Sequence, residues 1–438
     1  MKEYLEKHIK DIFNSLGIKV PFKVYNCNVD TLPDWTKQIQ LTNEFIVYCH
    51  DISLKQRLQV FTGKNIFQYE NFIYWFEGNR IVTLENVKIK VIDNNNKNIK
   101  CLKTNTRLPS FLDDFIYNQL RAIYAPNFQR FDYNLNLTNE DILKYLGTYF
   151  PRSYAESFCI FDNIFQNKEY QQAISKKSIL NILSVGSGTG GDIIGLIIAI
   201  EKYFQQVSKI NIYAIDGNFE ALTILIKLVD NFRNHTSKII NINTIKSIFS
   251  SVSDITSDKI ITNEFDFILS FKLICEIITM DNENNNNSYY DFIIKFLPML
   301  KKNGLCILLD VTTKSNHTRY NPILMNRQVN QALRELDNYK SLLPISCNIY
   351  EKQCYFDCFN QQIFTVTHQK QTNDKSKVTY RVIGHNDLVN KIVSNANDSK
   401  LLVNNRNICP HTVNYLKTED AYFLKQSYKR IKGELKEN

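Results

Sequence analysis

The stretch ILSVGSGTGGD, Ile182–Asp192, decides the fold of this chain. The apolar run Leu180–Val185 predicts a buried strand, and the residues from Asp192 onward predict a helix. Glycine suits the turn between them because, without a Cβ, the backbone can turn sharply and a ligand can lie against it. The free N–H groups at the start of a helix add hydrogen-bond donors. The stretch therefore predicts a strand, turn and helix that hold a ligand.

The glycines fit two cofactor-binding patterns. Gly186, Gly188 and Gly190 give G-x-G-x-G, whereas Gly186, Gly188 and Gly191 give the G-x-G-x-x-G pattern of dinucleotide-binding folds. The glycines alone do not choose between the two cofactor classes.

The surrounding chain alternates apolar strand-like runs with helical segments, which is typical of a parallel sheet with helices on both faces. We expect an α/β fold with a Rossmann-like, mostly parallel seven-stranded sheet. Its strands are expected at Leu180–Val185, Lys209–Ile215, Ile239–Ile245, Phe265–Ser270, Leu305–Val311, Gln362–Thr367 and Lys377–Ile383. A polar turn over Gln369–Ser376 would make the last two strands an antiparallel hairpin, whereas a dinucleotide fold would continue with a parallel strand and helix.

Asp216, followed by Gly217 and Asn218, ends the second apolar strand and precedes a helix. A carboxylate at this place accepts hydrogen bonds from ribose hydroxyls in both cofactor classes. The alternative is that Asp216 caps the next helix, and the two roles are compatible. At the end of the fourth strand, Ser270 and Phe271 could face the cofactor and the substrate.

These motifs resemble those of the class I, Rossmann-like S-adenosylmethionine (SAM) dependent methyltransferases, over about Leu180 to His385. The resemblance implies SAM as the cofactor and methyl transfer as the activity. The residues that it implies for cofactor binding are Gly186, Ser187, Gly188, Thr189, Gly190, Asp216, Gly217, Asn218, Ser270 and Phe271. An NAD(P)-dependent oxidoreductase stays open as an alternative.

The segment from Tyr145-Leu146 through Phe150-Pro151-Arg152-Ser153-Tyr154-Ala155, with Phe265–Ile277, is similar to the mitochondrial small-ribosomal-subunit methyltransferase-like family. This narrower resemblance implies RNA or a ribosomal particle as a partner. It also leaves open a non-catalytic assembly factor. That family carries a cysteine cluster for iron–sulfur binding, from which this sequence departs. No metal site is predicted here, although a site built from Cys347, Cys354, Cys358 and Cys409 stays an alternative.

Methyl transfer from a sulfonium mainly needs alignment, so no universal catalytic residue is expected and none is assigned. The fourth strand lacks the Asn/Asp-Pro-Pro-aromatic motif of amino-group methylation. Glu276 could act as a base, and Arg152 and Tyr154 could cover the cofactor. Core or surface roles are the competing interpretations for these residues, as they are for Cys275, His368 and His385.

The 438 residues are too many for one ordinary domain. We expect an α+β N-terminal domain of unknown role over 1–110, a helical connector over 111–178, the methyltransferase domain over 179–388 and a basic extension over 389–438. The formal net charge of +9 favours RNA over protein or a small molecule as the substrate. No apolar run is long enough to span a membrane, so a cytoplasmic protein without a membrane partner is expected. The sequence does not indicate an oligomeric state.

Overall fold

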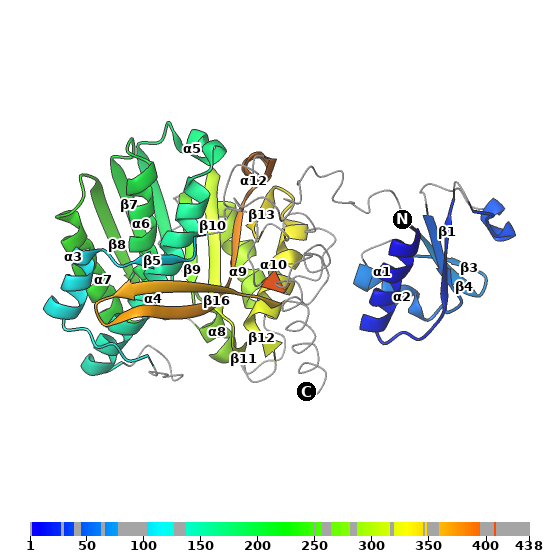
Figure 1. The fold of residues 1–438 in the computed structure, drawn as a ribbon, viewed down its shortest axis with the longest axis horizontal. Coiled ribbons are helices and arrows are strands. Elements are labelled where there is room, and N and C mark those ends of the chain that lie inside the picture. The colour runs from blue at the N-terminus through cyan, green and yellow to red at the C-terminus, as the bar shows by residue number, and fades with distance from the viewer. Residues whose placement is uncertain are drawn as a thin grey trace. The chain divides into compact units, whose positions relative to one another are not determined.

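The structure is a computed structural model, and it describes residues 2–27, 30–38, 45–62, 66–77, 103–126, 137–248, 250–255, 264–280, 287–315, 319–344, 347, 359–394 and 407–408. The chain divides into two compact units, 1–97 and 98–438 (Figure 1). None of the described helices is both long enough and apolar enough to cross a membrane.

The first unit is α+β, as the sequence predicts. Its elements are α1 (Lys2–Ser15), β1 (Phe22–Asn26), the 3-10 helix η1 (Asp34–Gln38), β2 (Phe45–Cys49), α2 (Leu54–Thr62), β3 (Phe67–Tyr69) and β4 (Phe72–Glu77). The strands form an antiparallel sheet in the order β1-β2-β4-β3. The two helices pack on one face, where Leu5, Leu58 and Val47 belong to one core. Alternating residues such as Tyr48 and Tyr74 form a second, aromatic cluster.

The second unit contains the predicted alternation of strands and helices. Its elements are β5 (Asn105–Arg107), α3 (Ser110–Asp114), the π-helix η2 (Phe115–Gln119), α4 (Asn139–Phe165), α5 (Lys168–Ile174), β6 (Ile179–Val185), α6 (Gly191–Tyr203), β7 (Lys209–Asp216), α7 (Phe219–Arg233), β8 (Ile239–Lys246), β9 (Phe265–Phe271), α8 (Ile274–Met280), α9 (Ser288–Phe296), η5 (Leu297–Met299), β10 (Leu300–Val311), β11 (Lys314–Ser315), β12 (Arg319–Tyr320), α10 (Asn321–Glu335), β13 (Tyr339–Leu343), β14 (Phe359–Asn360), β15 (Gln362–His368), β16 (Gln371–His385), α12 (Asn386–Ser394) and β17 (Asn407–Ile408).

One mixed sheet organises this unit, in the order β5-β15-β16-β10-β9-β6-β7-β8, with β13 also paired to β16. The neighbours from β10 to β8 are parallel, and β16 is antiparallel to β10. The predicted Rossmann-like sheet is confirmed, although it has two more strands than the seven expected. The two extra strands, β5 and β13, are short, and neither has the long apolar run on which the sequence prediction relied. β5 belongs to the larger unit, although its residues fall within the range expected for the N-terminal domain.

The antiparallel hairpin after the fifth strand of the parallel series is present as β15 and β16. The expected turn over Gln369–Ser376 is wrong, because β16 already begins at Gln371. Its first residues are mostly polar and exposed, so they carry no apolar pattern from which a strand could be predicted.

The sequence predicts a helix that Thr138 caps and that ends near Gly147, and a second helix that starts at Phe150. The structure has a single helix, α4, in place of both. Thr138 caps it as predicted, with Asp141 completing a capping box. Gly147 does not end the helix; a Cβ there would lie 2.5 Å from the backbone oxygen of Ile123, so glycine allows a close approach. Pro151 cannot donate to the carbonyl of Gly147, and the Tyr117 hydroxyl donates to that oxygen instead, at 2.6 Å. The helix therefore continues through both helix breakers.

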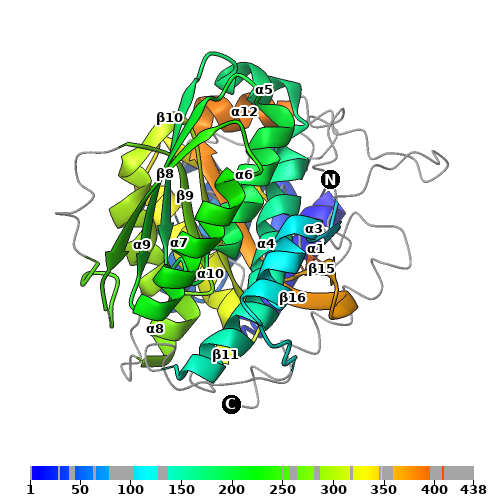
Figure 2. The same cartoon turned by 90° about the vertical axis from the view of Figure 1, so that its left-hand side faces the viewer.

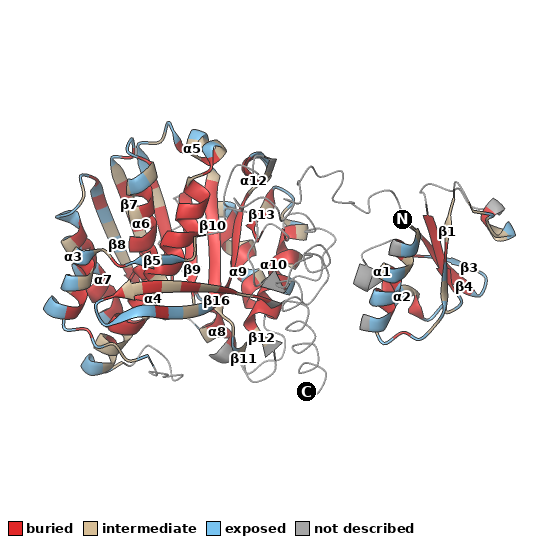
Figure 3. Ribbon diagram, viewed as in Figure 1, coloured by how far each residue is buried: buried red, intermediate tan, exposed pale blue. Residues whose placement is uncertain are grey.

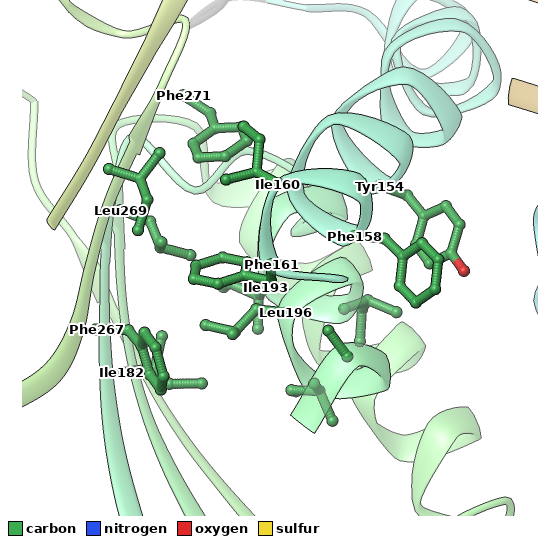
Figure 4. Packing of buried hydrophobic residues seen from close by; sticks show 14 of the residues in the cluster. Tyr154, Phe158, Ile160, Phe161, Ile182, Ile193, Leu196, Phe267, Leu269 and Phe271 are labelled. Carbon is green, nitrogen blue, oxygen red and sulfur yellow. The ribbon is translucent and has the colours of Figure 1, made fainter. Parts of the chain in front are cut away.

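Helices cover both faces of the sheet, and a separate core fills each side (Figure 2). On one side α4, α6 and α7 pack against Phe267 and Leu269 of β9, and on the other α8, α9 and α10 pack against Ile268. Figure 3 shows β9 and β10 buried along most of their length. Figure 4 shows the first core, in which Phe161 of α4 and Ile193 of α6 lie over Phe267. The parallel strands therefore lie between two apolar layers, with their carboxyl ends along one edge.

Candidate functional site

The glycine loop joins β6 to α6 at the carboxyl end of the sheet. Gly186, Gly188 and Gly190 all have positive φ, of 72°, 51° and 82°, a region that favours glycine over residues with a Cβ. Ser187 and Thr189 lie between them and are buried. The amides of Gly186 and Ser187 both donate to the Ile215 carbonyl, which fixes the loop to β7. The turn predicted from the sequence therefore brings these five residues together beside the second strand.

Gly191 differs from the three loop glycines. It begins α6, and a Cβ there would lie 2.6 Å from the Phe150 oxygen of α4. One turn later, a Cβ at Gly195 would lie 2.6 Å from the Tyr154 oxygen. These two glycines let α6 and α4 pack closely. Gly191 thus serves helix packing, and the glycines with positive φ are the three of the G-x-G-x-G pattern.

Asp216 ends β7 and reaches back to the loop. Its Oδ2 accepts from the Gly188 amide at 2.7 Å, and its Oδ1 accepts from the Asn218 amide at 2.8 Å. Burial raises the pKa of Asp216, while these backbone N–H groups lower it. Asp216 does not cap α7; that role belongs to Asn218, whose Oδ1 accepts from Ala221 at 3.0 Å. Gly217 connects the two residues.

Tyr145 of α4 lies over the loop, although it was not predicted as a cofactor-binding residue. A Cβ on Gly188 would lie 2.8 Å from the Tyr145 hydroxyl oxygen. Burial raises the pKa of Tyr145 well above its usual value, and the charges of Glu276 and Asp216 raise it further. Tyr145, Tyr149, Ser153 and Glu156 follow a helical spacing of four, four and three residues. That spacing was the signal by which this stripe could have been found.

The end of β9 brings two predicted residues to opposite faces of the sheet. Phe271 packs in the core beside Ile160 and Leu269 (Figure 4). Ser270 is buried, and its Oγ has no hydrogen-bond partner among the described residues. Lys272 follows with φ of 61°, which is strained for a residue with a Cβ. A Cβ on Gly186 would lie 2.7 Å from the Leu273 side chain, so this turn lies against the glycine loop.

Two buried carboxyl groups also lie at this end of the sheet. Burial raises the pKa of Asp192, the second residue of α6, to about 6, while the Ser184 hydroxyl, bonded at 2.7 Å, and the Lys272 charge lower it. Burial likewise raises the pKa of Asp310, near the end of β10, to about 6. Asp310 accepts from the Tyr289 hydroxyl at 2.9 Å and from the Cys275 amide at 3.0 Å.

The other candidate residues lie apart from the loop or have partners. Arg152 forms a bidentate pair with Asp374 of β16, and Tyr154 stacks on Phe158 (Figure 4). His368 is buried against Tyr117.

His385 contacts the Leu300 carbonyl at 3.0 Å, at the amino end of the sheet. Cys275 is buried, and its thiol donates to the Lys272 carbonyl at 3.5 Å. Glu276 is near enough to Tyr145 to raise the pKa of that hydroxyl.

Within the described residues, no group of three or more His, Cys, Asp or Glu side chains could hold a metal ion. Cys347 is buried and makes no disulfide, whereas Cys354, Cys358 and Cys409 lie outside the described residues. Most of the predicted basic extension lies outside them as well.

Comparison with known proteins gives similarity to solved structures alone. No protein-family model and no curated protein match the chain. The plantazolicin methyltransferase BpumL is similar at 13% identity and a TM-score of 0.30, covering 54% of this chain and 89% of BpumL. The SAM-dependent methyltransferase from Agrobacterium tumefaciens has 9% identity and a TM-score of 0.29, covering 51% of this chain and 62% of that one. TrmN from Thermus thermophilus has 14% identity and a TM-score of 0.26, covering 49% and 48%. The fold is therefore assigned from the strand order of this chain.

Proposed function

We propose that this chain binds SAM at the glycine loop and transfers its methyl group to a macromolecular acceptor, with RNA favoured over protein. The observation that carries the proposal is the pairing of Gly188 with Asp216. The left-handed loop at the end of β6 and the carboxylate at the end of β7 are joined by a hydrogen bond of 2.7 Å. SAM lying along this edge would meet the carboxylate with its ribose hydroxyls and the loop with its methionyl part.

The side chains around the loop fit such a ligand. Ser187 Oγ, Ser270 Oγ and Glu156 Oε1 are buried and have no hydrogen-bond partner among the described residues. A buried polar atom without a partner costs about 1–3 kcal/mol, and a polar ligand at this edge would remove part of that cost. Gly188 is close enough to Tyr145 that any side chain there would crowd the loop. When bound, SAM supplies an activated methyl group, and the chain has to bind, orient and exclude water.

The order and direction of the strands support SAM over a dinucleotide. After β10 the sheet continues with the antiparallel strand β16, where a dinucleotide fold would add a parallel strand.

The preference for RNA rests on the net charge of +9 and on the narrower resemblance carried by Tyr145 and the residues up to Ala155. Tyr145 and Tyr149 of that segment lie with their ring centroids 5.2 Å apart, the first of them over the loop. We further propose that the protein acts in the cytoplasm.

Transfer of label from radioactive SAM to fractionated RNA, protein and metabolites of an extract tests the proposal. We expect labelled RNA with the wild-type chain and none with Asp216→Ala. SAM binding without transfer to any fraction would favour a non-catalytic assembly factor. Binding of NAD(H) with no binding of SAM would favour an oxidoreductase.

A further inference from the structure

Glu156 is a carboxylate buried between α4 and the end of β9. Its side chain is fully buried, and Oε2 accepts from the Lys272 ammonium at 2.5 Å. Its other oxygen, Oε1, has no hydrogen-bond partner among the described residues. An ionised carboxylate is an acceptor at both oxygens, so Glu156 retains a buried acceptor that a donor from outside the chain could satisfy.

Lys272 is the partner of Glu156, and it is the strained member of the pair. Its φ of 61° is unusual for a residue with a Cβ, and strain of this kind is concentrated at functional sites. Its ammonium donates to Glu156 and, at 3.2 Å, to Ser153 Oγ. An ammonium has three N–H groups, so one remains for another acceptor. The Lys272 side chain is 17% exposed, whereas that of Glu156 is fully buried.

The pair lies beside the glycine loop. Ser153 is close to Gly191, where a Cβ would lie 2.9 Å from that of Ser153. Ser157 Oγ donates to the Asp192 carbonyl at 2.6 Å, which fixes this part of α4 to the first turn of α6. Leu273, next to Lys272, is the residue that a Cβ on Gly186 would meet. The residue next to Glu156 in the chain therefore contacts the start of α6, and the residue next to Lys272 contacts the glycine loop.

We propose that Glu156 and Lys272 bind the amino acid end of the cofactor, with Glu156 accepting from its ammonium and Lys272 donating to its carboxylate. The inference rests on the proposed function, since SAM carries a ribose in its adenosine part and this zwitterion at its other end. Asp216 and the Glu156–Lys272 pair lie on opposite sides of the loop, at the ends of β7 and β9, which flank β6. The site thus offers an acceptor for the ribose hydroxyls on one side of the loop and charges complementary to the zwitterion on the other.

Binding would add partners to the existing ion pair. The ligand ammonium would donate to Glu156 Oε1, and the remaining N–H of Lys272 would donate to the ligand carboxylate. Each charge would then have a partner of opposite sign, which avoids the cost of leaving a buried charge unpaired. In the free protein Lys272 satisfies Glu156 Oε2 and leaves Oε1 without a donor.

Two ligands separate this inference from the proposed function. S-adenosylhomocysteine carries the adenosine and the amino acid end, whereas methylthioadenosine carries the adenosine and sulfur without the amino acid end. Calorimetry on the full chain should show that Glu156→Gln weakens S-adenosylhomocysteine binding about tenfold or more, as for the loss of a charge-assisted hydrogen bond. Its affinity for methylthioadenosine should stay within about twofold of the wild-type value. Lys272→Met should show the same selectivity.

Glu201→Gln is the matched control, because Glu201 is a partly buried glutamate near the far end of α6, bonded to Thr236. It should bind both ligands as the wild type does. Equal loss of both ligands in Glu156→Gln, or no loss of S-adenosylhomocysteine, would overturn the inference. If either variant does not fold, the wild type alone decides, because equal affinity for the two ligands excludes a role for the amino acid end. Failure of the wild type to bind either ligand would instead contradict the proposed function.

Discussion

Buried charged side chains lie at both ends of the parallel strands, but their hydrogen-bond partners differ. At the amino end Asp266 is fully buried and accepts from Lys177, from Lys301 at 3.0 Å and from the Asn181 amide at 2.9 Å. At the carboxyl end Glu156 has one lysine partner and one oxygen without a donor, and Ser187 and Ser270 have unpartnered hydroxyls among the described residues. Both oxygens of Asp266 accept hydrogen bonds within the chain, whereas Glu156 and the two serines leave an acceptor and hydroxyls for a ligand.

Neighbouring strands reinforce this difference. Asn181, Asn211 and Asn241 join β6, β7 and β8 near the amino end, through side-chain hydrogen bonds of 3.0 Å and 3.1 Å. The carboxyl ends of β6 and β9 instead run into turns with positive φ, at Gly186 and Lys272. Substitutions at the amino end should therefore affect stability, and those at the carboxyl end should affect ligand binding.

The largest effect is expected for Asp266→Ala. The change leaves two lysines and a backbone N–H without their shared acceptor, and removing one partner of a buried ion pair costs about 3–5 kcal/mol. Chemical denaturation should show this loss in the free energy of unfolding. Asp230→Ala, which removes an exposed pair with Arg233, is the control and should change stability by about 0.5 kcal/mol or less. A loss for Asp266→Ala as small as that of the control would refute the assignment of a stabilising role to the amino end.

The second effect concerns binding. Gly188→Arg places a side chain against the Tyr145 hydroxyl at a residue with φ of 51°. We expect the affinity for SAM to fall about a hundredfold or more, equivalent to about 2.7 kcal/mol. Gly17→Arg carries similar backbone strain, with φ of 65°, but a Cβ there would have nothing within 4 Å. This control should keep full SAM affinity in calorimetry, and a comparable loss of binding would show that strain alone explains the effect.

The smallest effect is a dependence of stability on pH. Burial holds the folded-state pKa of Asp310 at about 6, above its ordinary value of 3.8. The unfolded chain therefore loses this proton first as the pH rises. The free energy of unfolding should fall by about 2 kcal/mol between about pH 4 and pH 7 on account of this group, at about 1.4 kcal/mol per pKa unit.

In Asp310→Asn, the free energy of unfolding should fall by about 2 kcal/mol less between the same two pH values than in the wild type. Chemical denaturation at both pH values measures this difference. Asp254 offers a contrast, because hydrogen bonds from Ser251 lower its pKa, so its contribution is lost as the pH falls. An unchanged pH dependence in Asp310→Asn would contradict the account of this carboxyl group.

Local sequence pattern was enough to predict the parallel sheet, the glycine loop and the position of Asp216. Each depends on residues adjacent in the chain, an apolar strand followed by a turn. Tyr145 and Glu156 were not predicted as site residues, because they meet the loop and Lys272 only through the packing of α4 on α6. The helix end predicted at Gly147 is wrong. Glycine is favoured at a helix end and also where two backbone segments approach closely, and at Gly147 the second reason applies.

Calorimetric titration of the full chain with SAM and, separately, with NAD tests the central claim most directly. The claim is that the Gly186–Gly190 loop and Asp216 hold SAM. We predict micromolar SAM binding by the wild type, its loss in Asp216→Ala and no binding of NAD. Tight NAD binding with no heat from SAM would contradict the account, as would SAM binding that Asp216→Ala leaves unchanged.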